Sequence, residues 1–132
     1  MDIQHLTRSY GRCTLSPSFF DDFYEELMQS SPDIKNKFTG VDMAKQKSLL
    51  KEGISFLLML NKGSDVAKRK ISALAGTHSK DHQNIEPWMY DHWKASLLKT
   101  VKAHDPKIDD ALLESWDLAL QGGIKMLIEK YS

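Results

Sequence analysis

Residues 87–104, PWMYDHWKASLLKTVKAH, decide the fold class of the chain. Pro87 suits the first turn of a helix, where its missing N–H needs no partner, and Asp105-Pro106 ends the segment. Apolar side chains recur at intervals of three and four residues, which places them on one helical face: Met89, Tyr90, Trp93, Leu97, Leu98 and Val101. The stretch therefore predicts a long amphipathic helix that buries this face.

Helical patterns continue on both sides of this stretch. Leucine occurs 16 times and valine 3 times, and no Asn-Gly or Asp-Gly hairpin turn occurs, so the composition favours helices over strands. Capping residues and helix breakers set the bounds. We predict helices from Ser16-Pro17 to just before Ser30, from Asp42 to about Leu60, from Ser64 to a frayed end near His82 to Asn84, and from about Ile108 to Tyr131, with a short turn over Pro32 to Phe38.

Length and charge limit the class of protein. A chain of 132 residues fits one domain, so residues 1–132 are predicted to form a single helical unit. The 18 basic and 18 acidic residues cancel, which leaves no basic surface for nucleic acid. The longest apolar run, Phe56 to Leu60, is too short for a membrane span, and Met1 to Cys13 has no signal-peptide core. We expect a soluble, cytoplasmic protein, in which the single Cys13 forms no internal disulfide.

A pair of glycines, Gly122-Gly123, interrupts the last predicted helix. Each glycine costs a helix roughly 1 kcal/mol relative to alanine. A cost of this size predicts a compensating feature, which is either a close contact with another helix or a kink.

Two polar side chains fall within otherwise apolar helical faces. Gln46 shares a face with Met43 and Leu50, and His78 follows Leu74 by one turn on another predicted helix. Burial of either side chain requires hydrogen bonds or a ligand. Each residue is therefore a satisfied polar group of the core, a residue at the edge of its apolar face, or a ligand-binding residue, and its position alone leaves these interpretations open.

The order of several motifs along nearly the whole chain resembles the bacterial single-domain globins and the haem domain of flavohaemoglobins. These motifs are Asp22-Phe23-Tyr24, Pro32-Asp33-Ile34-Lys35 with Phe38, Gln46 with Leu50, Leu74-Ala75-Gly76-Thr77-His78, and Ile85 with Pro87 and Tyr90. The separation of Gln46 from His78, 78 − 46 = 32 residues, also suits this family. Trp116 and the closing residues resemble the last helix of the family more loosely.

The resemblance implies an all-α globin fold, a three-on-three helical sandwich around a pocket for haem b (iron protoporphyrin IX). It implies that His78 is the residue that ligates the iron. The other cofactor-binding residues that it implies are Tyr24, Phe38, Gln46, Leu50, Leu74, His82 and Tyr90. Tyr24 and Gln46 would donate hydrogen bonds to a gas ligand, whereas Phe38 and Leu50 would exclude water. His82 would bond a haem propionate, or else lie exposed at a helix end.

A globin of this kind would bind O2 reversibly, together with NO and CO, and would serve oxygen binding, transport, storage or sensing. One alternative is an NO dioxygenase that works with a separate, external reductase, because no Gly-rich dinucleotide motif is present. Another is a haem-free interaction module with a globin fold, which would have no need for the combination of Tyr24, Phe38, Gln46 and His78. The expected partners are these gases and an external reductase. The sequence does not decide between a monomer and a homodimer.

Two further expectations concern the surroundings of the haem. Counting forward from Trp116 brings Tyr131, not a glutamate, to the place where the family has an acidic partner for the histidine, with Glu129 close by in sequence. Several basic side chains on solvated helical faces could reach a propionate: Lys45, Lys47 and Arg69.

Overall fold

The computed structural model describes residues 2–132, which form seven helices and no strand. The helices are α1 (Ile3–Thr14), α2 (Phe19–Ser30), α3 (Pro32–Lys37), α4 (Met43–Leu60), α5 (Asp65–Thr77), α6 (Pro87–His104) and α7 (Asp110–Glu129). The all-helical class is therefore confirmed. Within residues 2–132, no helix is both long and apolar enough to cross a membrane.

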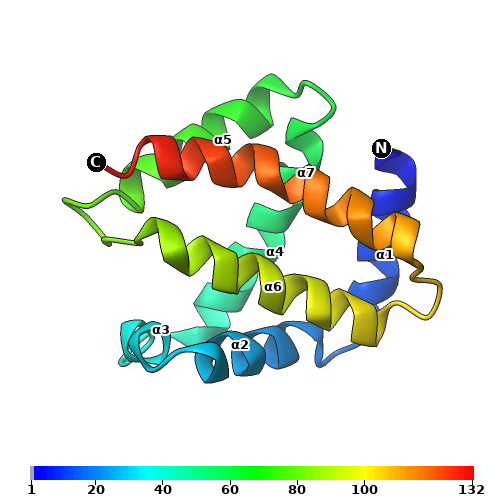
Figure 1. The fold of residues 1–132 in the computed structure, drawn as a ribbon, viewed down its shortest axis with the longest axis horizontal. Helices are drawn as coiled ribbons and strands as arrows, with labels where there is room; N and C mark the ends of the chain where they lie inside the picture. Colours follow the sequence, from blue (N-terminus) through cyan, green and yellow to red (C-terminus); the bar gives the residue numbers. More distant parts are fainter. Residues whose placement is uncertain (1) are drawn as a thin grey trace.

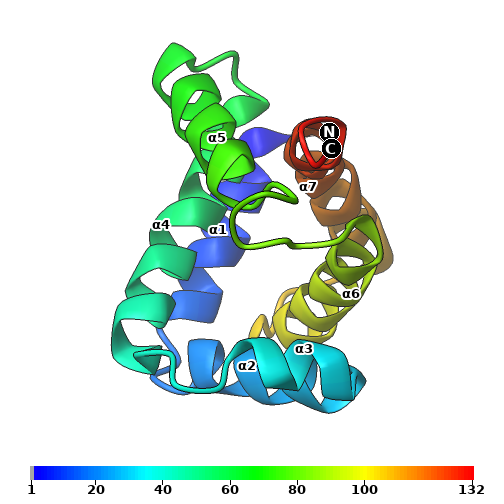
Figure 2. The same cartoon turned by 90° about the vertical axis from the view of Figure 1, so that its left-hand side faces the viewer.

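The helices form two packed groups. Figure 1 shows α2, α6 and α7 as roughly parallel rods, with α4 crossing behind them. Figure 2, turned by 90°, shows α1, α4 and α5 on one side and α6 and α7 on the other, while α2 and α3 lie along the bottom. The helix pairs α2–α6, α4–α5 and α5–α7 make the most extensive contacts. This arrangement is the predicted three-on-three helical sandwich.

Capping side chains fix where several helices begin. The Asp42 carboxylate accepts hydrogen bonds from the backbone N–H groups of Ala44 and Lys45, which would have no partner inside α4. Ser64 caps α5 in the same way, as predicted. Asp2 caps α1 and Asp109 caps α7. These local interactions explain why the predicted beginnings of α4 and α5 agree with the structure.

Three elements at the N-terminal side differ from the prediction. Helix α2 begins at Phe19, with Ser18 as its N-cap, and not at Ser16-Pro17. Helix α1 is missing from the predicted set, because its few apolar side chains, among them Leu6, Tyr10 and Cys13, are spaced among polar residues. Residues 32–38, predicted as a turn, contain the short helix α3 instead. Pro32 lies at its first position, where the fixed φ of proline favours a helical start.

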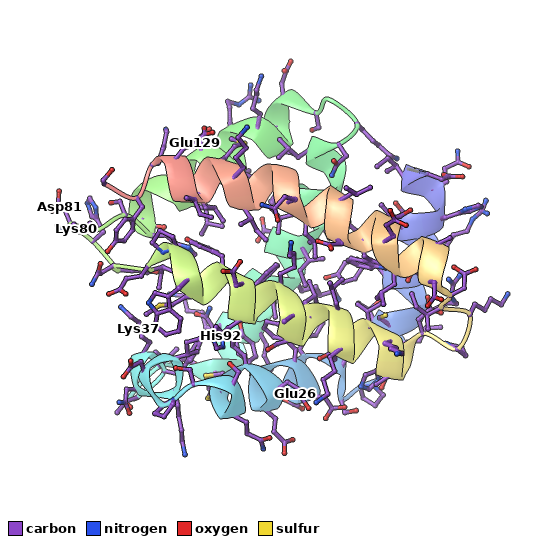
Figure 3. All side chains as sticks on the ribbon, in the orientation of Figure 1. Glu26, Lys37, Lys80, Asp81, His92 and Glu129 are labelled. Carbon is purple, nitrogen blue, oxygen red and sulfur yellow. The ribbon has the colours of Figure 1, made fainter. Side chains whose placement is uncertain are left out.

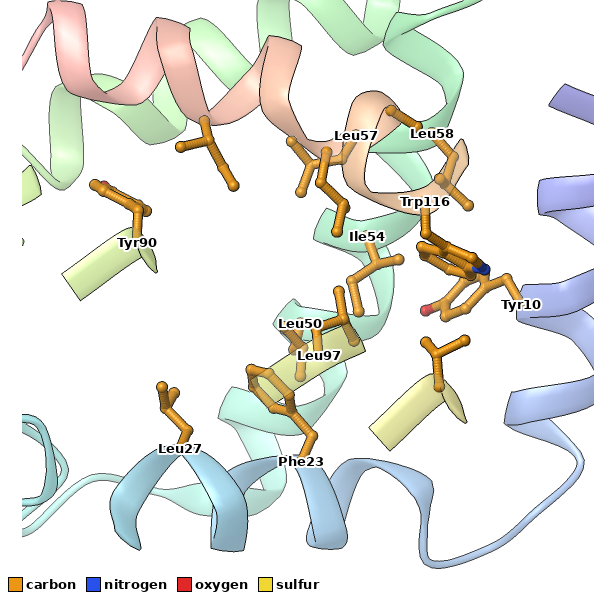
Figure 4. Packing of buried hydrophobic residues seen from close by; sticks show 14 of the residues in the cluster. Tyr10, Phe23, Leu27, Leu50, Ile54, Leu57, Leu58, Tyr90, Leu97 and Trp116 are labelled. Atoms are coloured by element: carbon orange, nitrogen blue, oxygen red, sulfur yellow. The ribbon is translucent and has the colours of Figure 1, made fainter. Parts of the chain in front are cut away.

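The core runs through the whole molecule and has a polar network at one end. Figure 4 shows Phe23, Leu50, Ile54, Leu97 and Trp116 among the buried side chains, which come from several helices. The indole Nε1 of Trp116 donates to Ser9 Oγ at 2.9 Å, and this hydroxyl donates to Asp105 Oδ2 at 2.6 Å.

The Asp105 carboxylate at the end of α6 is fully buried and paired. The guanidinium of Arg12 donates to both of its oxygens, at 2.5 and 2.9 Å. Burial alone would raise the pKa of Asp105, but the hydrogen bonds from Arg12, Ser9 and the N–H of Lys107 outweigh it and hold this pKa at about 2. The network ties α1 to the corner between α6 and α7.

The glycine pair in α7 has different surroundings at its two positions. A Cβ at Gly123 would collide with Cδ2 of Leu57 on α4, whereas a Cβ at Gly122 would meet no atom within 4 Å. The helix runs without a break from Asp110 to Glu129. The predicted close helix contact is therefore confirmed at Gly123, and it lets α4 and α7 approach each other.

Candidate functional site

His78 stands directly after the last residue of α5, where it forms the C-cap of the helix. Its backbone N–H donates to Leu74 O at 3.0 Å. The helix thus ends at Thr77, and the predicted extension to His82 or beyond is wrong. Thr77 Oγ1 also donates to Leu74 O. Ser79 Oγ donates to Gly76 O, and the N–H of Lys80, which would bond to Gly76 O in a longer helix, donates to Tyr131 O instead.

The imidazole of His78 is paired with a tyrosine from the neighbouring helix. Nδ1 of His78 lies 3.0 Å from the hydroxyl oxygen of Tyr90 on α6, and the two rings are inclined by 25°. Burial lowers the pKa of His78 to about 4, so the imidazole is neutral at neutral pH. Burial also raises the pKa of Tyr90 to about 12, which keeps its hydroxyl protonated.

This pairing determines which nitrogen of His78 can act as a ligand. A neutral imidazole has one N–H and one lone pair, and the hydrogen bond of one nitrogen sets the role of the other. When Nδ1–H donates to Tyr90 Oη, Nε2 carries the lone pair that a metal requires. A neutral histidine held in this way fits a haem iron.

The loop that follows His78 is bound to two distant parts of the chain. The Nζ of Lys37, at the end of α3, donates to Gln83 O at 3.1 Å and to Asn84 O at 2.7 Å. The hydroxyl of Tyr131 donates to Asn84 Oδ1 at 2.6 Å, and the N–H of Lys80 donates to Tyr131 O at 2.8 Å. Figure 3 shows Lys80 at the outer end of this loop. These bonds hold Asn84 at a φ of 53°, which is uncommon for a residue other than glycine.

Tyr131 occupies the sequence position at which the family has an acidic partner for the ligand histidine, but here it has a different role. It holds the loop through Asn84, while the partner of the His78 imidazole is Tyr90. Glu129 is exposed near the end of α7 (Figure 3). The structure thus brings Tyr90 into contact with His78, as expected. Leu74, one turn before His78, is partly buried against the core.

A second group of predicted site residues comes from α2, from the end of α3 and from α4. The Tyr24 ring packs edge-on against Phe38 with their centroids 5.5 Å apart, and the Tyr24 hydroxyl donates to the backbone oxygen of Gln46 at 3.4 Å. Burial raises the pKa of Tyr24 to about 12, so this hydroxyl remains a donor. Leu50 is buried one turn beyond Gln46 on α4, and Figure 4 shows it across the core from Tyr90.

Gln46 and His82 lie in less enclosed positions than the other predicted residues. Gln46 is half-buried, and its backbone carbonyl, not its side chain, receives the hydrogen bond from Tyr24. His82 is exposed in the loop after α5, where its Nδ1 lies 2.9 Å from Ser79 Oγ. The ammonium of Lys47 pairs with Asp21 on α2 at 2.6 Å.

Lys37 is a residue near the site that the sequence did not single out. It connects α3, just before Phe38, to the loop just after His78, and so joins the two groups of site residues. These partners lie 46 and 47 residues away in sequence. Only a resemblance or a structure could have revealed this contact, because local patterns carry no information about it.

The comparisons with known proteins agree with this fold. The globin family model matches residues 21–127, and the chain belongs to the globin family. Globins typically bind haem. The chain is also similar to a crystal structure of the protein PA3967 from Pseudomonas aeruginosa PAO1, described as structurally highly homologous to a human haemoglobin. The sequences are 38% identical, 98% of each chain is covered, and the TM-score is 0.94. No curated protein matches the chain.

Proposed function

We propose that this globin holds haem b through His78 and binds O2 reversibly, with NO and CO as further ligands. The observation that carries the proposal is the contact between His78 Nδ1 and Tyr90 Oη at 3.0 Å. It leaves Nε2 for a ligand, on an imidazole that burial keeps neutral. Haem, when bound, supplies the iron at which the gas is held.

Tyr24 is the residue proposed to hold O2. Its hydrogen bond to Gln46 O is long, at 3.4 Å, and therefore weak. The hydroxyl thus loses little hydrogen-bond energy when it rotates towards a ligand. O2 accepts a stronger hydrogen bond than CO does, and a donor at this position therefore favours O2. The resemblance to the haem domain of flavohaemoglobins adds Gln46 as a second donor, whose longer side chain must first be ordered.

Phe38 and Leu50 are proposed to keep water away from the gas. Leu50 is 9% exposed, and Phe38 packs on the ring of Tyr24. An apolar surround strengthens the hydrogen bond from Tyr24, because fewer water molecules compete for it. These features suit an O2-binding protein that releases its ligand slowly, for storage or sensing.

Substitution of Tyr24 tests the proposal. Loss of the hydroxyl in Tyr24→Phe should raise the O2 dissociation rate by about tenfold to a hundredfold, and affect CO much less, since one or two donors are worth roughly 1 to 3 kcal/mol. Stopped-flow displacement of O2 by CO measures this rate. Tyr10→Phe is the matched control, because the Tyr10 ring packs against Phe19 and Trp116 and its hydroxyl donates to Lys51 O. An unchanged rate in Tyr24→Phe would refute the role of Tyr24.

A further inference from the structure

The ammonium of Lys37 joins α3 to the loop that follows His78. Its Nζ donates to Gln83 O at 3.1 Å and to Asn84 O at 2.7 Å, and Figure 3 shows Lys37 between α3 and this loop. Lys37 is half-buried and directly precedes Phe38. In Figure 2, α3 and the loop between α5 and α6 both face the viewer, at the same end of the molecule. At this end, the two bonds therefore connect the group of site residues around Phe38 to the group around His78.

The partners of Lys37 are two backbone carbonyls and not a carboxylate. No ion pair of Lys37 is found among residues 2–132. In the same part of the chain, no other group donates a hydrogen bond to the carbonyl oxygen of Gln83 or of Asn84. A hydrogen bond from a charged donor is stronger than one between neutral groups. Lys37 is thus a dedicated attachment point for this loop.

The loop transmits this attachment to His78. The N–H of Asn84 donates to Ser79 O at 2.9 Å, and the N–H of Ile85 donates to His78 O at 3.0 Å. Asn84 has a φ of 53°, and a residue other than glycine keeps such a conformation only where neighbouring contacts hold it. The two bonds from Lys37 are among these contacts. They therefore help to hold the turn of backbone that carries His78.

We propose that Lys37 is a clamp that holds the loop after His78 against α3 and thereby slows the release of haem. Haem that is bound by both groups of site residues leaves when the groups separate, and the two bonds from Lys37 oppose this separation. The ammonium is a positioning group that acts on His78 through the loop, and it needs no contact with haem. The proposal rests on the proposed function, because it names a residue that retains the cofactor of that same site.

Amide hydrogen exchange in the haem-free protein tests the clamp without any cofactor. Lys37→Met keeps the length of the side chain but removes its charged donor, so the amides of Asn84 and Ile85 should exchange about tenfold faster. The amide of Leu97, in the core part of α6, should exchange at the wild-type rate, because the clamp acts locally. Lys37→Arg retains a charged donor and should restore slow exchange.

Lys35→Met is the matched control, because it removes an exposed ammonium from the same helix. It should leave the exchange of Asn84 and Ile85 at the wild-type rate. Wild-type exchange of these two amides in Lys37→Met would overturn the clamp. An equal acceleration at Leu97 would also overturn it, because the substitution would then lower the stability of the whole fold.

The transfer of haem to an excess of an apoglobin tests the consequence in the haem-loaded protein. Lys37→Met should speed this transfer by about tenfold, Lys37→Arg should restore the slow rate, and Lys35→Met should leave it unchanged. The same acceleration is expected with haem dimethyl ester, in which both propionates are neutral, because the clamp does not involve them. An acceleration with haem but not with the ester would overturn the clamp and make Lys37 a partner of a propionate.

The outcomes separate this proposal from the proposed function. Wild-type transfer rates in a Lys37→Met protein that binds haem normally would overturn the clamp and leave the proposed function intact. Absence of haem binding in the wild type would overturn the proposed function and the retention of haem by Lys37 together. The exchange of Asn84 and Ile85 in the haem-free protein would still show whether Lys37 holds the loop.

Discussion

The hydroxyl oxygen of Tyr90 lies 3.0 Å from Nδ1 of His78, and this contact joins the first turn of α6 to the residue that ends α5. The Tyr90 side chain is held by packing, since it is 5% exposed and belongs to the main core. The bond therefore fixes the rotation of the imidazole. A ligand histidine whose ring is already held in place is prepared for a metal before the metal arrives.

Removal of this hydrogen bond should weaken haem binding. We expect Tyr90→Phe to lower haem affinity by about tenfold to a hundredfold, as is typical when the hydrogen-bond partner of a ligand histidine is lost. The rate of haem transfer to an excess of an apoglobin measures the effect. Tyr10→Phe also removes one buried tyrosine hydroxyl, but that hydroxyl donates to Lys51 O and not to His78, so this variant should retain haem as the wild type does. Equal haem transfer from all three proteins would show that Tyr90 does not support His78.

The two adjacent glycines of α7 should respond in opposite directions to the same substitution. Gly123→Ala should destabilise the fold by about 1 kcal/mol, because overpacking costs about 1 to 3 kcal/mol and the gain in helix propensity offsets only part of it. Gly122→Ala has open space around the new methyl and should stabilise by up to about 1 kcal/mol. Urea unfolding of both variants measures the difference. Stabilisation by both substitutions would show that the contact between Gly123 and Leu57 imposes no constraint.

The buried Asp105 carboxylate should make stability depend on acidity. The pKa of Asp105 in the folded protein, about 2, lies below the ordinary value of 3.8. As the pH falls, this carboxylate is therefore protonated in the unfolded chain before it is protonated in the folded protein. The contribution is therefore complete above about pH 5, where it amounts to about 2 kcal/mol, and is lost as the pH falls towards 2. Unfolding free energies between pH 2 and pH 6 measure the slope.

Asp105→Asn should flatten this part of the pH profile and destabilise the fold by about 3 kcal/mol at neutral pH, because it leaves the Arg12 guanidinium without its charged partner. Asp91→Asn, at an exposed position on α6, is the control and should change stability by less than about 0.5 kcal/mol. An acid profile that is unchanged in Asp105→Asn would contradict the low pKa of this carboxylate.

Elements with strong local patterns could be predicted from the sequence. Helix α6 begins at Pro87 and ends at His104 as expected, because proline at the first turn and Asp105-Pro106 after the last turn act locally. The end of α5 could not be predicted, because it depends on the bond from Ser79 Oγ to Gly76 O and on the bond from the Lys80 N–H to Tyr131 O, a residue far away in the sequence. The spacing of apolar residues along the sequence carries no information about these hydrogen bonds.

The candidate site, like the helices, could be predicted from the sequence only in part. Apolar spacing marked Gln46 and His78 as unusual, but only the resemblance to globins connected them with Tyr24 and Tyr90. The contacts of Lys37 with the loop after His78 join residues far apart in sequence, and no periodicity encodes them. The open surface hollow lined by Tyr24, Met28 and Met43 likewise depends on how α2, α3 and α4 cross.

A haem titration of the wild type and His78→Ala, followed by absorbance in the Soret region, tests most directly whether His78 holds the cofactor. We expect the wild type to bind one equivalent, with a band that shifts on reduction and again with CO. His78→Ala should lose stoichiometric binding and recover it when imidazole is added, while its circular dichroism remains helical. An unchanged ferrous spectrum in His78→Ala would contradict the assignment and point to another ligand such as His82. The absence of a Soret band in the reconstituted wild type would contradict haem binding itself.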